Sequence, residues 1–151
     1  MGNIRRAEKR DAARLAEIEI FNYRLNFYPI FRRDEYYFGE LSVPTAAENY
    51  LKNEYILHNT YVYDDGVVKG FVRIDGSEAV KLFVEPSLQG NAIGEKLLKY
   101  TVEEHNADFL WALEKNVRAI RFYERNGFHL TDEKKLEEDT AKYLVKAIRS
   151  K

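Results

Sequence analysis

One stretch of the sequence, from Glu78 to Tyr123, alternates strand and helix patterns and restricts the fold more than any other. The segment SEAVKLFVEP is rich in strand-forming residues and ends at Pro86, and GEKLLKYTVEEH carries helical apolar spacing. DFLWAL predicts a second strand. Two parallel strands joined by a helix form a βαβ unit, whose first turn presents free backbone amides at a helix start. The sequence therefore predicts an anion-binding turn.

Helices are predicted before this unit. We expect Asp11 to cap a helix through Asn22, whose apolar residues recur every three and four positions. We expect Pro29 to interrupt that pattern. The aromatic and basic segment 29–44 is predicted to be a loop or broken helix, and Thr45 to cap a second helix.

The remaining strands complete a mixed sheet. Runs rich in β-branched and aromatic residues predict strands at 4–7, 61–63, 67–74, 127–130 and 141–148. Asp65–Gly66 is a strong hairpin signal, whereas the charged stretch Thr131–Asp139 is predicted to separate the last two strands. The order βααβββαβαββ predicts an α/β sandwich around a mixed β-sheet, in a single domain over residues 1–151.

The composition restricts the class of protein. Hydrophobic residues make up 45% and charged residues 32% of the 151 residues, which is typical of a globular protein. The net charge of −1 gives no reason to expect nucleic acid or a membrane surface as a partner. No apolar run approaches the ~18 residues of a membrane span, and the N-terminus lacks the apolar core of a signal peptide. The absence of cysteine excludes thiolate chemistry and suits a cytoplasmic location.

The turn after the first central strand reads Gln89-Gly90-Asn91-Ala92-Ile93-Gly94. Its glycines allow backbone amides to approach a ligand, and the following helix adds its positive end. A phosphate or diphosphate is the expected ligand. No Gly-Lys-Ser/Thr follows, and the spacing differs from the dinucleotide fingerprint. Taken alone, the loop is better explained as an ordinary strand-to-helix turn.

The last predicted helix has a signal at each end. Asn116 is placed to cap its start, and Gly127 follows its end. Ala119 and Tyr123 share a face with Asn116, whereas Phe122 points to an adjacent side and is expected to enter the core. For Tyr123 alone, the favoured explanation is a half-buried aromatic whose hydroxyl has a backbone partner.

These two segments together resemble the GCN5-related N-acetyltransferase family. Its acyl-CoA motif, Gln/Arg-x-x-Gly-x-Gly/Ala, is matched by Gln89, Ala92 and Gly94, with Ala92 in place of the more usual glycine. Its second motif, Asn-x-x-Ala-x-x-Phe-Tyr followed by Gly-Phe, is matched by Asn116, Ala119, Phe122, Tyr123, Gly127 and Phe128. The resemblance is strong from Glu78 to Phe128, and the order of elements agrees over the whole chain.

The resemblance implies a site for acetyl-CoA as co-substrate, without a metal. The diphosphate would bind the amides of Gln89–Glu95, and the pantetheine arm would add to the open edge of Leu82–Val84. That edge is open only if the two central strands splay apart. The residues implied at the carrier are Leu82, Phe83, Val84, Gln89, Gly90, Asn91, Ala92, Ile93, Gly94, Glu95, Asn116, Ala119, Phe122 and Tyr123.

The resemblance also implies a direct transfer of the acetyl group to an amine. Tyr123 is then the general acid for the departing thiolate, because a phenol remains protonated at the pKa of a thiol. Glu78 is the candidate base, since strand alternation puts Glu78, Val80, Leu82 and Val84 on one face. A solvated carboxylate at the strand end explains Glu78 equally well. A non-catalytic CoA-binding module and a nucleotide-binding α/β domain are the competing functions.

Other side chains carry weaker signals. Lys96, Arg121 and Arg125 are candidates for phosphate contacts, although a solvated helix face explains each of them as well. The three histidines have no ligand spacing, so we expect no metal site. Trp111 is expected to be a core residue.

The resemblance places the amine acceptor between two loops, Phe27–Leu41 and Thr131–Asp139. The first loop contains aromatic residues and two adjacent arginines, namely Tyr28, Phe31, Arg32, Arg33, Tyr36, Tyr37 and Phe38. Such a loop suits a small amine with a carboxylate or aromatic part. A packing patch or a homodimer surface is an equal alternative, and an amine of a protein stays open as acceptor.

Overall fold

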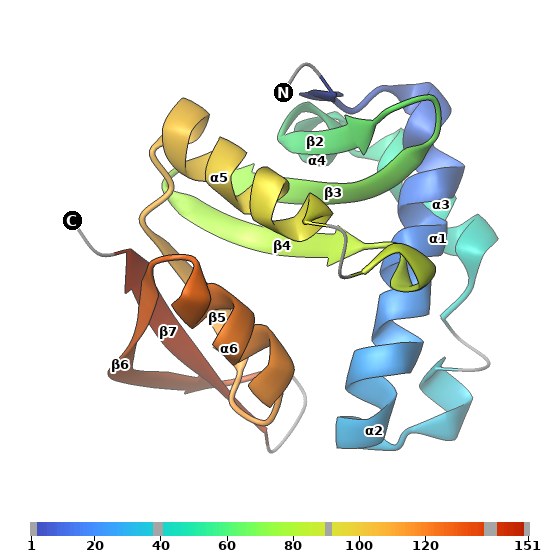
Figure 1. Ribbon diagram of the computed structural model, residues 1–151. Helices are drawn as coiled ribbons and strands as arrows, with labels where there is room; N and C mark the ends of the chain where they lie inside the picture. Colours follow the sequence, from blue (N-terminus) through green and yellow to red (C-terminus); the bar gives the residue numbers. More distant parts are fainter. Residues whose placement is uncertain (1–2, 38–40, 90–91, 138–141, 150–151) are drawn as a thin grey trace.

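The structure is a computed structural model that describes residues 3–37, 41–89, 92–137 and 142–149. These residues form a seven-stranded sheet in the order β1-β2-β3-β4-β5-β7-β6 (Figure 1). The strands are β1 Ile4–Arg6, β2 Thr60–Asp64, β3 Val68–Asp75, β4 Glu78–Val84, β5 Phe109–Leu113, β6 Phe128–Leu136 and β7 Tyr143–Arg149. The described neighbours are antiparallel except β4 and β5, which are parallel. The predicted mixed sheet is confirmed.

Helices cover both faces of this sheet. They are α1 Ala12–Asn22, α2 Tyr28–Phe31, α3 Val43–Lys52, α4 Glu54–His58, α5 Ile93–His105 and α6 Val117–Arg125. Leu15 and Ile18 of α1 pack with Phe71 on one face, and Leu97 of α5 packs with Val72 on the other. In Figure 1, α5 crosses β3 and β4, and α6 lies over β5 and β7. The predicted α/β sandwich is therefore confirmed.

The first helix is longer than predicted. Its turns continue from α1 through a π-helical turn, Tyr23–Phe27, into α2, where the chain leaves the helix at Arg32 with a φ of 54°. Pro29 lies in the first turn of α2. Proline cannot donate to the helical ladder, but the π-helical turn directly before it already interrupts the regular i to i−4 ladder at that point. Helical turns therefore continue through Pro29, and the predicted interruption there is wrong.

Both predicted helix caps are also wrong in detail. The Asp11 carboxylate makes no capping bond to α1, because it accepts the Glu8 amide at 2.7 Å and pairs with Arg5 at 2.8 Å. The second helix begins at Val43, and its cap is Ser42, three residues before the predicted cap, with Ser42 Oγ accepting the Thr45 amide at 3.3 Å. Side chains such as those of Asp11, Ser42 and Thr45 can bond to several nearby backbone groups, and tertiary contacts determine which of these bonds forms.

The hairpins agree with prediction, with one extension. β2 and β3 pair antiparallel around Asp65–Gly66. β6 runs on to Leu136 through most of the predicted charged loop, with an irregularity between Leu130 and Lys134. An edge strand tolerates lysine and glutamate on both faces because one side of it meets solvent. The loop prediction is therefore wrong for residues 131–136, whereas 138–141 lie outside the described residues.

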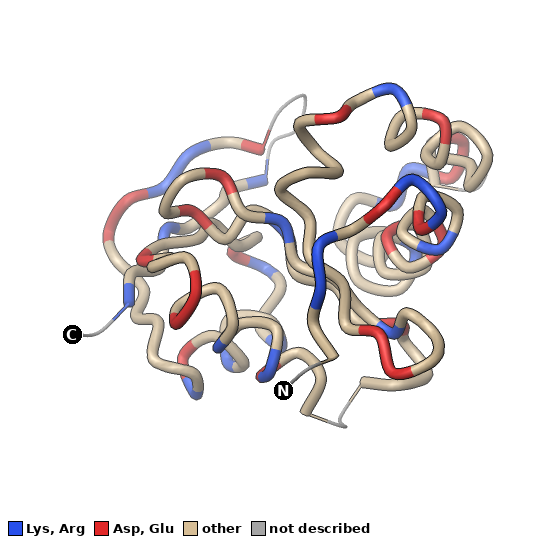
Figure 2. Tube along the Cα trace, turned by 90° about the horizontal axis from the view of Figure 1, so that it is seen from above, with Lys and Arg blue, Asp and Glu red and all other residues tan. Residues whose placement is uncertain are grey.

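Charge is distributed evenly over the molecule. Figure 2 shows basic and acidic residues interspersed along the trace, in agreement with the net charge of −1. Among the described residues, we find no helix with the length and apolar character needed to cross a lipid bilayer.

Candidate active site

The two central strands diverge. β4 and β5 share one register pair, Glu78 with Phe109, and the Asp108 amide donates to Ser77 O at 2.9 Å beside it. Beyond that pair, the other edge of β5 remains bonded to β7. The gap therefore opens toward the carboxyl ends of β4 and β5, and the predicted splay is confirmed.

The divergence leaves backbone amides of β4 facing the gap. The Glu85 amide donates to Lys69 O at 2.9 Å, toward β3. Because antiparallel strands alternate the direction of their peptide groups, Leu82 and Val84 direct theirs toward the gap. Val84 O already accepts Asn22 Nδ2 at 2.9 Å and Gln89 Nε2 at 3.2 Å. The amides of Leu82 and Val84 are therefore the open donors of this edge.

A cavity of about 1080 Å³ occupies the gap and extends to both faces of the sheet. The predicted site residues that line it are Glu78, Leu82, Phe83, Val84, Gln89, Ala92, Ile93, Gly94, Glu95, Asn116, Ala119, Phe122 and Tyr123. Gly90 and Asn91 lie outside the described residues. Segments that are distant in the sequence thus meet at one site, as the two motifs predict.

The start of α5 borders the cavity. Ala92 has a φ of 63° and is the residue before α5, which begins at Ile93. A Cβ on Gly94 would lie 3.3 Å from Phe122 Cζ, so glycine permits α5 to approach α6 closely. The Gln89 side chain bonds to Asn22 Oδ1 at 3.1 Å and thereby ties the turn to α1. The first turn of α5 faces the cavity through Gly94 and Glu95.

α6 brings a phenol to the gap. Asn116 Oδ1 accepts the Ala119 amide at 3.3 Å, which confirms Asn116 as the cap. Tyr123 is half-buried, and its hydroxyl has no hydrogen-bond partner among the described residues. Those residues also contain no enclosed polar side-chain atom without a partner, so this hydroxyl is open to the cavity. Burial raises the pKa of Tyr123 to about 12.

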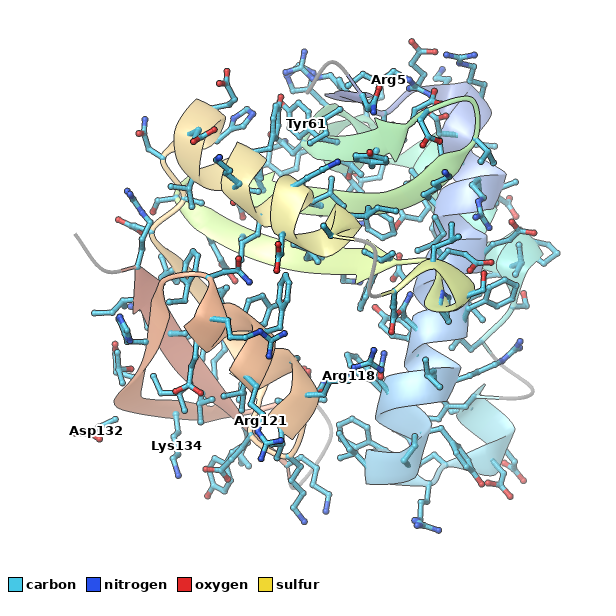
Figure 3. All side chains as sticks on the ribbon, viewed as in Figure 1. Arg5, Tyr61, Arg118, Arg121, Asp132 and Lys134 are labelled. Atoms are coloured by element: carbon cyan, nitrogen blue, oxygen red, sulfur yellow. The ribbon has the colours of Figure 1, made fainter. Side chains whose placement is uncertain are left out.

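The face of α6 toward the gap is basic. Arg118, Arg121 and Arg125 all line the cavity, and no ion pair of theirs occurs within the described part of the chain. Figure 3 shows Arg118 between α6 and α1. Lys96, the other predicted phosphate candidate, lies over the Tyr63 ring at 5.7 Å.

Glu78 lies at the closed end of the gap, on a different face from the one predicted. The ladder between β3 and β4 shifts register so that Val80 is the extra residue of a β-bulge. The bulge reverses the alternation of side chains, so Glu78 shares a face with Lys81 instead of Leu82 and Val84. Alternation alone could not reveal the bulge, and the predicted common face is wrong.

The Glu78 carboxyl is set between opposing charges. Burial raises the pKa of Glu78 above its usual range, and Asp75 adds to this effect. The ammonium groups of Lys135 and Lys146 act in the opposite direction. A raised carboxyl pKa is the shift that a proton acceptor working near neutral pH requires.

Trp111 is not the core residue that the sequence predicts. The indole is half-buried and lines the cavity, with Lys135 Nζ 4.3 Å from its ring centroid. Residues on β5 alternate between faces, and Leu110 and Ala112 take the buried face under α6. Trp111 lies between these two residues in the sequence, so strand alternation directs its side chain to the opposite face of the sheet.

The two loops predicted at the acceptor contribute unequally. Phe27, Lys135 and Glu137 line the cavity. Arg32 and Arg33 instead border a separate hollow, and the Tyr37 ring packs on its aromatic neighbours. The aromatic segment is thus mostly a self-packed lobe, and Phe38 lies outside the described residues.

Several lining residues were not predicted from the sequence. They are Asn22, Tyr23, Asn26, Lys81, Leu88, Arg118 and Leu144. For Asn22, Tyr23 and Asn26, the only sign in the sequence was their spacing, which puts them near one another on a single helix. No group of three or more metal-ligating side chains is found within the described ranges.

Comparison with known proteins points to one family. Residues 57–130 match the family described as acetyltransferase (GNAT) domain. The chain is 34% identical over 91 residues to the peptidyl-lysine N-acetyltransferase YiaC of Escherichia coli strain K12. This match spans 60% of the chain and 60% of the length of that relative.

Solved structures share the fold over nearly the whole chain. The apo form of YjaB from Escherichia coli has a TM-score of 0.76 and 19% identity, covering 97% of this chain and 95% of that one. The PaiA N-acetyltransferase of Thermoplasma acidophilum, solved in complex with coenzyme A, has a TM-score of 0.67 and 19% identity, covering 95% and 96%. At this identity the two structures establish the fold. The family match over residues 57–130 and the two motifs identify this part of the chain with the acetyltransferase (GNAT) domain, and the solved structures show that nearly the whole chain has a similar fold.

Proposed function

We propose that this protein transfers an acetyl group from acetyl-CoA to a primary amine by direct attack on the thioester. The observation that carries the proposal is the open amide edge of Leu82–Val84, which faces Tyr123 across one cavity. A pantetheine arm contains amides of its own and can pair with such an edge as an added strand. The coenzyme A complex of PaiA, which has the same fold, supports this choice of carrier.

The charged end of the carrier would bind at the start of α5. The amides of Gln89–Glu95 and the positive end of the helix suit a diphosphate. Arg118, Arg121 and Arg125 line the same cavity and can bind further phosphate oxygens. On the other side of the splay, the amide of Leu82 or Val84 can donate to the thioester oxygen as negative charge develops there.

Proton transfer would involve Glu78 and Tyr123. An ammonium gives one proton to Glu78, directly or through water, and the neutral nitrogen then forms the C–N bond as the thioester C–S bond breaks. Tyr123 donates its proton to the departing thiolate, and the second proton lost by nitrogen restores the phenol. The raised pKa of Tyr123, about 12 through burial, keeps this donor protonated.

A second function is a CoA-binding module without catalysis. The same cavity and amide edge would serve it, so binding of acetyl-CoA cannot separate the two. The relative YiaC is named for peptidyl-lysine, and both protein amines and small amines remain acceptors to test. The chain contains no cysteine, and we propose that it acts in a reducing cytoplasm.

Amine-dependent release of CoA thiol from acetyl-CoA tests the proposal. We expect at least one amine of a broad panel to stimulate release, and Tyr123→Phe to lower kcat by roughly 100-fold, as expected for loss of a general acid. Tyr143→Phe is the control, because Tyr143 is exposed on β7 and does not line the cavity. If no amine stimulates release while acetyl-CoA still raises the Tm, the protein is a binding module.

A further inference from the structure

The acceptor side of the cavity contains one acidic and one basic side chain, Glu78 and Lys135. Glu78 and Lys135 both line it, and within the described ranges neither has an ion-pair partner. Neighbouring lysines are paired: Lys134 binds Glu114 at 2.5 Å, and Lys146 binds Glu133 at 3.4 Å.

Lys81, another lysine of this cavity, already has partners within the protein. Its ammonium lies 2.8 Å from Glu19 Oε2 and donates to the Tyr23 hydroxyl at 2.6 Å. Glu19 also accepts the hydroxyls of Tyr23 and Tyr50, and its pKa is lowered by Lys81 and these hydroxyls in spite of burial. This network leaves Lys135 as the ammonium of the acceptor side that can bind a ligand anion.

Aromatic side chains surround the two charges. Lys135 Nζ rests over Trp111, and the rings of Phe27 and Phe83 pack edge to face at 6.4 Å on the opposite wall. Glu78 pairs with Phe109, which is two residues before Trp111 on β5. Their levels along the sheet are therefore separated by roughly 7 Å, a distance that a small molecule can span.

Resting on the proposed transferase function, we infer that the acceptor is a small amine that also carries a carboxylate, of the amino-acid type. Its ammonium is attracted to Glu78 and its carboxylate to Lys135, so each unpaired charge of the cavity gains a partner. The Trp111 ring lies under the Lys135 ammonium, and Phe27 and Phe83 add apolar surface to the same cavity. Lys135 is thus a specificity-determining residue.

The test compares matched acceptors. We would measure kcat/KM for amino acids, for their carboxamides, and for a lysine-containing peptide with blocked ends and no acidic residue. A hydrogen-bonded charge contributes enough for the wild-type protein to prefer the free carboxylate by about 10-fold or more. Lys135→Gln should remove this preference. Lys134→Gln should keep it, because Lys134 projects from β6 away from the gap (Figure 3).

The possible results distinguish a failure of the proposed acceptor from a failure of the proposed transferase function. Equal or better use of the carboxamide or the blocked peptide would overturn the inference while leaving acetyl transfer intact. An equal loss with both acceptors in Lys135→Gln would do the same. If no acceptor releases CoA, the transferase function fails and the inference fails with it. An unchanged rise of Tm with acetyl-CoA verifies that each variant is folded.

Discussion

Tyr123 and Glu78 carry pKa shifts in the same direction from the same cause. Burial raises the pKa of the phenol to about 12, and it raises the pKa of the carboxyl above its usual range. The phenol is therefore a proton donor throughout the neutral range, whereas the carboxyl binds a proton more readily than an exposed glutamate does. Both shifts support the proposed roles of Tyr123 as acid and Glu78 as base.

The Glu78 shift has a consequence for stability. A carboxyl with a raised pKa in the folded state favours folding below its unfolded pKa of about 4.3, and this contribution is lost as the pH rises through the folded value. Glu78→Gln should therefore be at least as stable as the wild type at pH 7, with no advantage at pH 4. At the same time kcat/KM should fall by roughly 100-fold. Thermal unfolding at both pH values, with kinetics at pH 7, checks this prediction.

A loss of stability at pH 7 in Glu78→Gln would instead indicate a structural carboxylate. Glu124→Gln is the matched control, since Glu124 is an exposed acidic residue on α6 that does not line the cavity. We expect its stability to differ little between the two pH values.

Ala92 is the residue at which backbone strain is expected. Its φ of 63° lies in the left-handed region, which costs a residue with a Cβ roughly 1–2 kcal/mol. Ala92→Gly should stabilise the protein by about 1 kcal/mol, after the entropy of glycine is included. Ala46→Gly in the middle of α3 should destabilise it by a similar amount. Urea unfolding measures both, and a destabilised Ala92→Gly variant would contradict the strain.

At the scale of elements, β4 determines the site. The βαβ unit, the hairpin and the capped α6 were predictable because each depends on a local pattern. The bulge at Val80 was not, because it depends on how β3 and β4 align. The continuous helix through Pro29 and the cavity position of Trp111 likewise depend on tertiary contacts. The positions of the motif residues at the cavity were thus predictable from the sequence, whereas the face of β4 on which Glu78 lies was not.

Asn22 joins the end of α1 to the open edge of β4. Its amide donates to Ile18 O at 2.8 Å and Val84 O at 2.9 Å, and the residue is 2% exposed. Asn22→Ala should cost about 2 kcal/mol of unfolding free energy, because buried partners lose their bonds. Asn26→Ala removes one bond of 3.3 Å and should cost less than half as much. Equal losses in urea unfolding would contradict this role of Asn22.

At the scale of the whole molecule, the sheet consists of two parts. The strands β1–β4 and the strands β5, β7 and β6 are joined at the single register pair of β4 with β5. α5 covers the first part and α6 the second, and they meet where Gly94 contacts Phe122. A ligand in the gap would contact both parts, so acetyl-CoA should raise the Tm, and the rise should continue with the logarithm of its concentration above the Kd.

Amide hydrogen exchange at β4 tests the central claim most directly. The amides of Leu82 and Val84 face the gap, whereas the amide of Phe83 faces β3. Saturating acetyl-CoA should slow exchange at Leu82 and Val84 by at least about 10-fold, with a smaller change at Phe83. If Leu82 and Val84 are already protected in the free protein, or if acetyl-CoA leaves their exchange unchanged, the open edge does not bind the carrier.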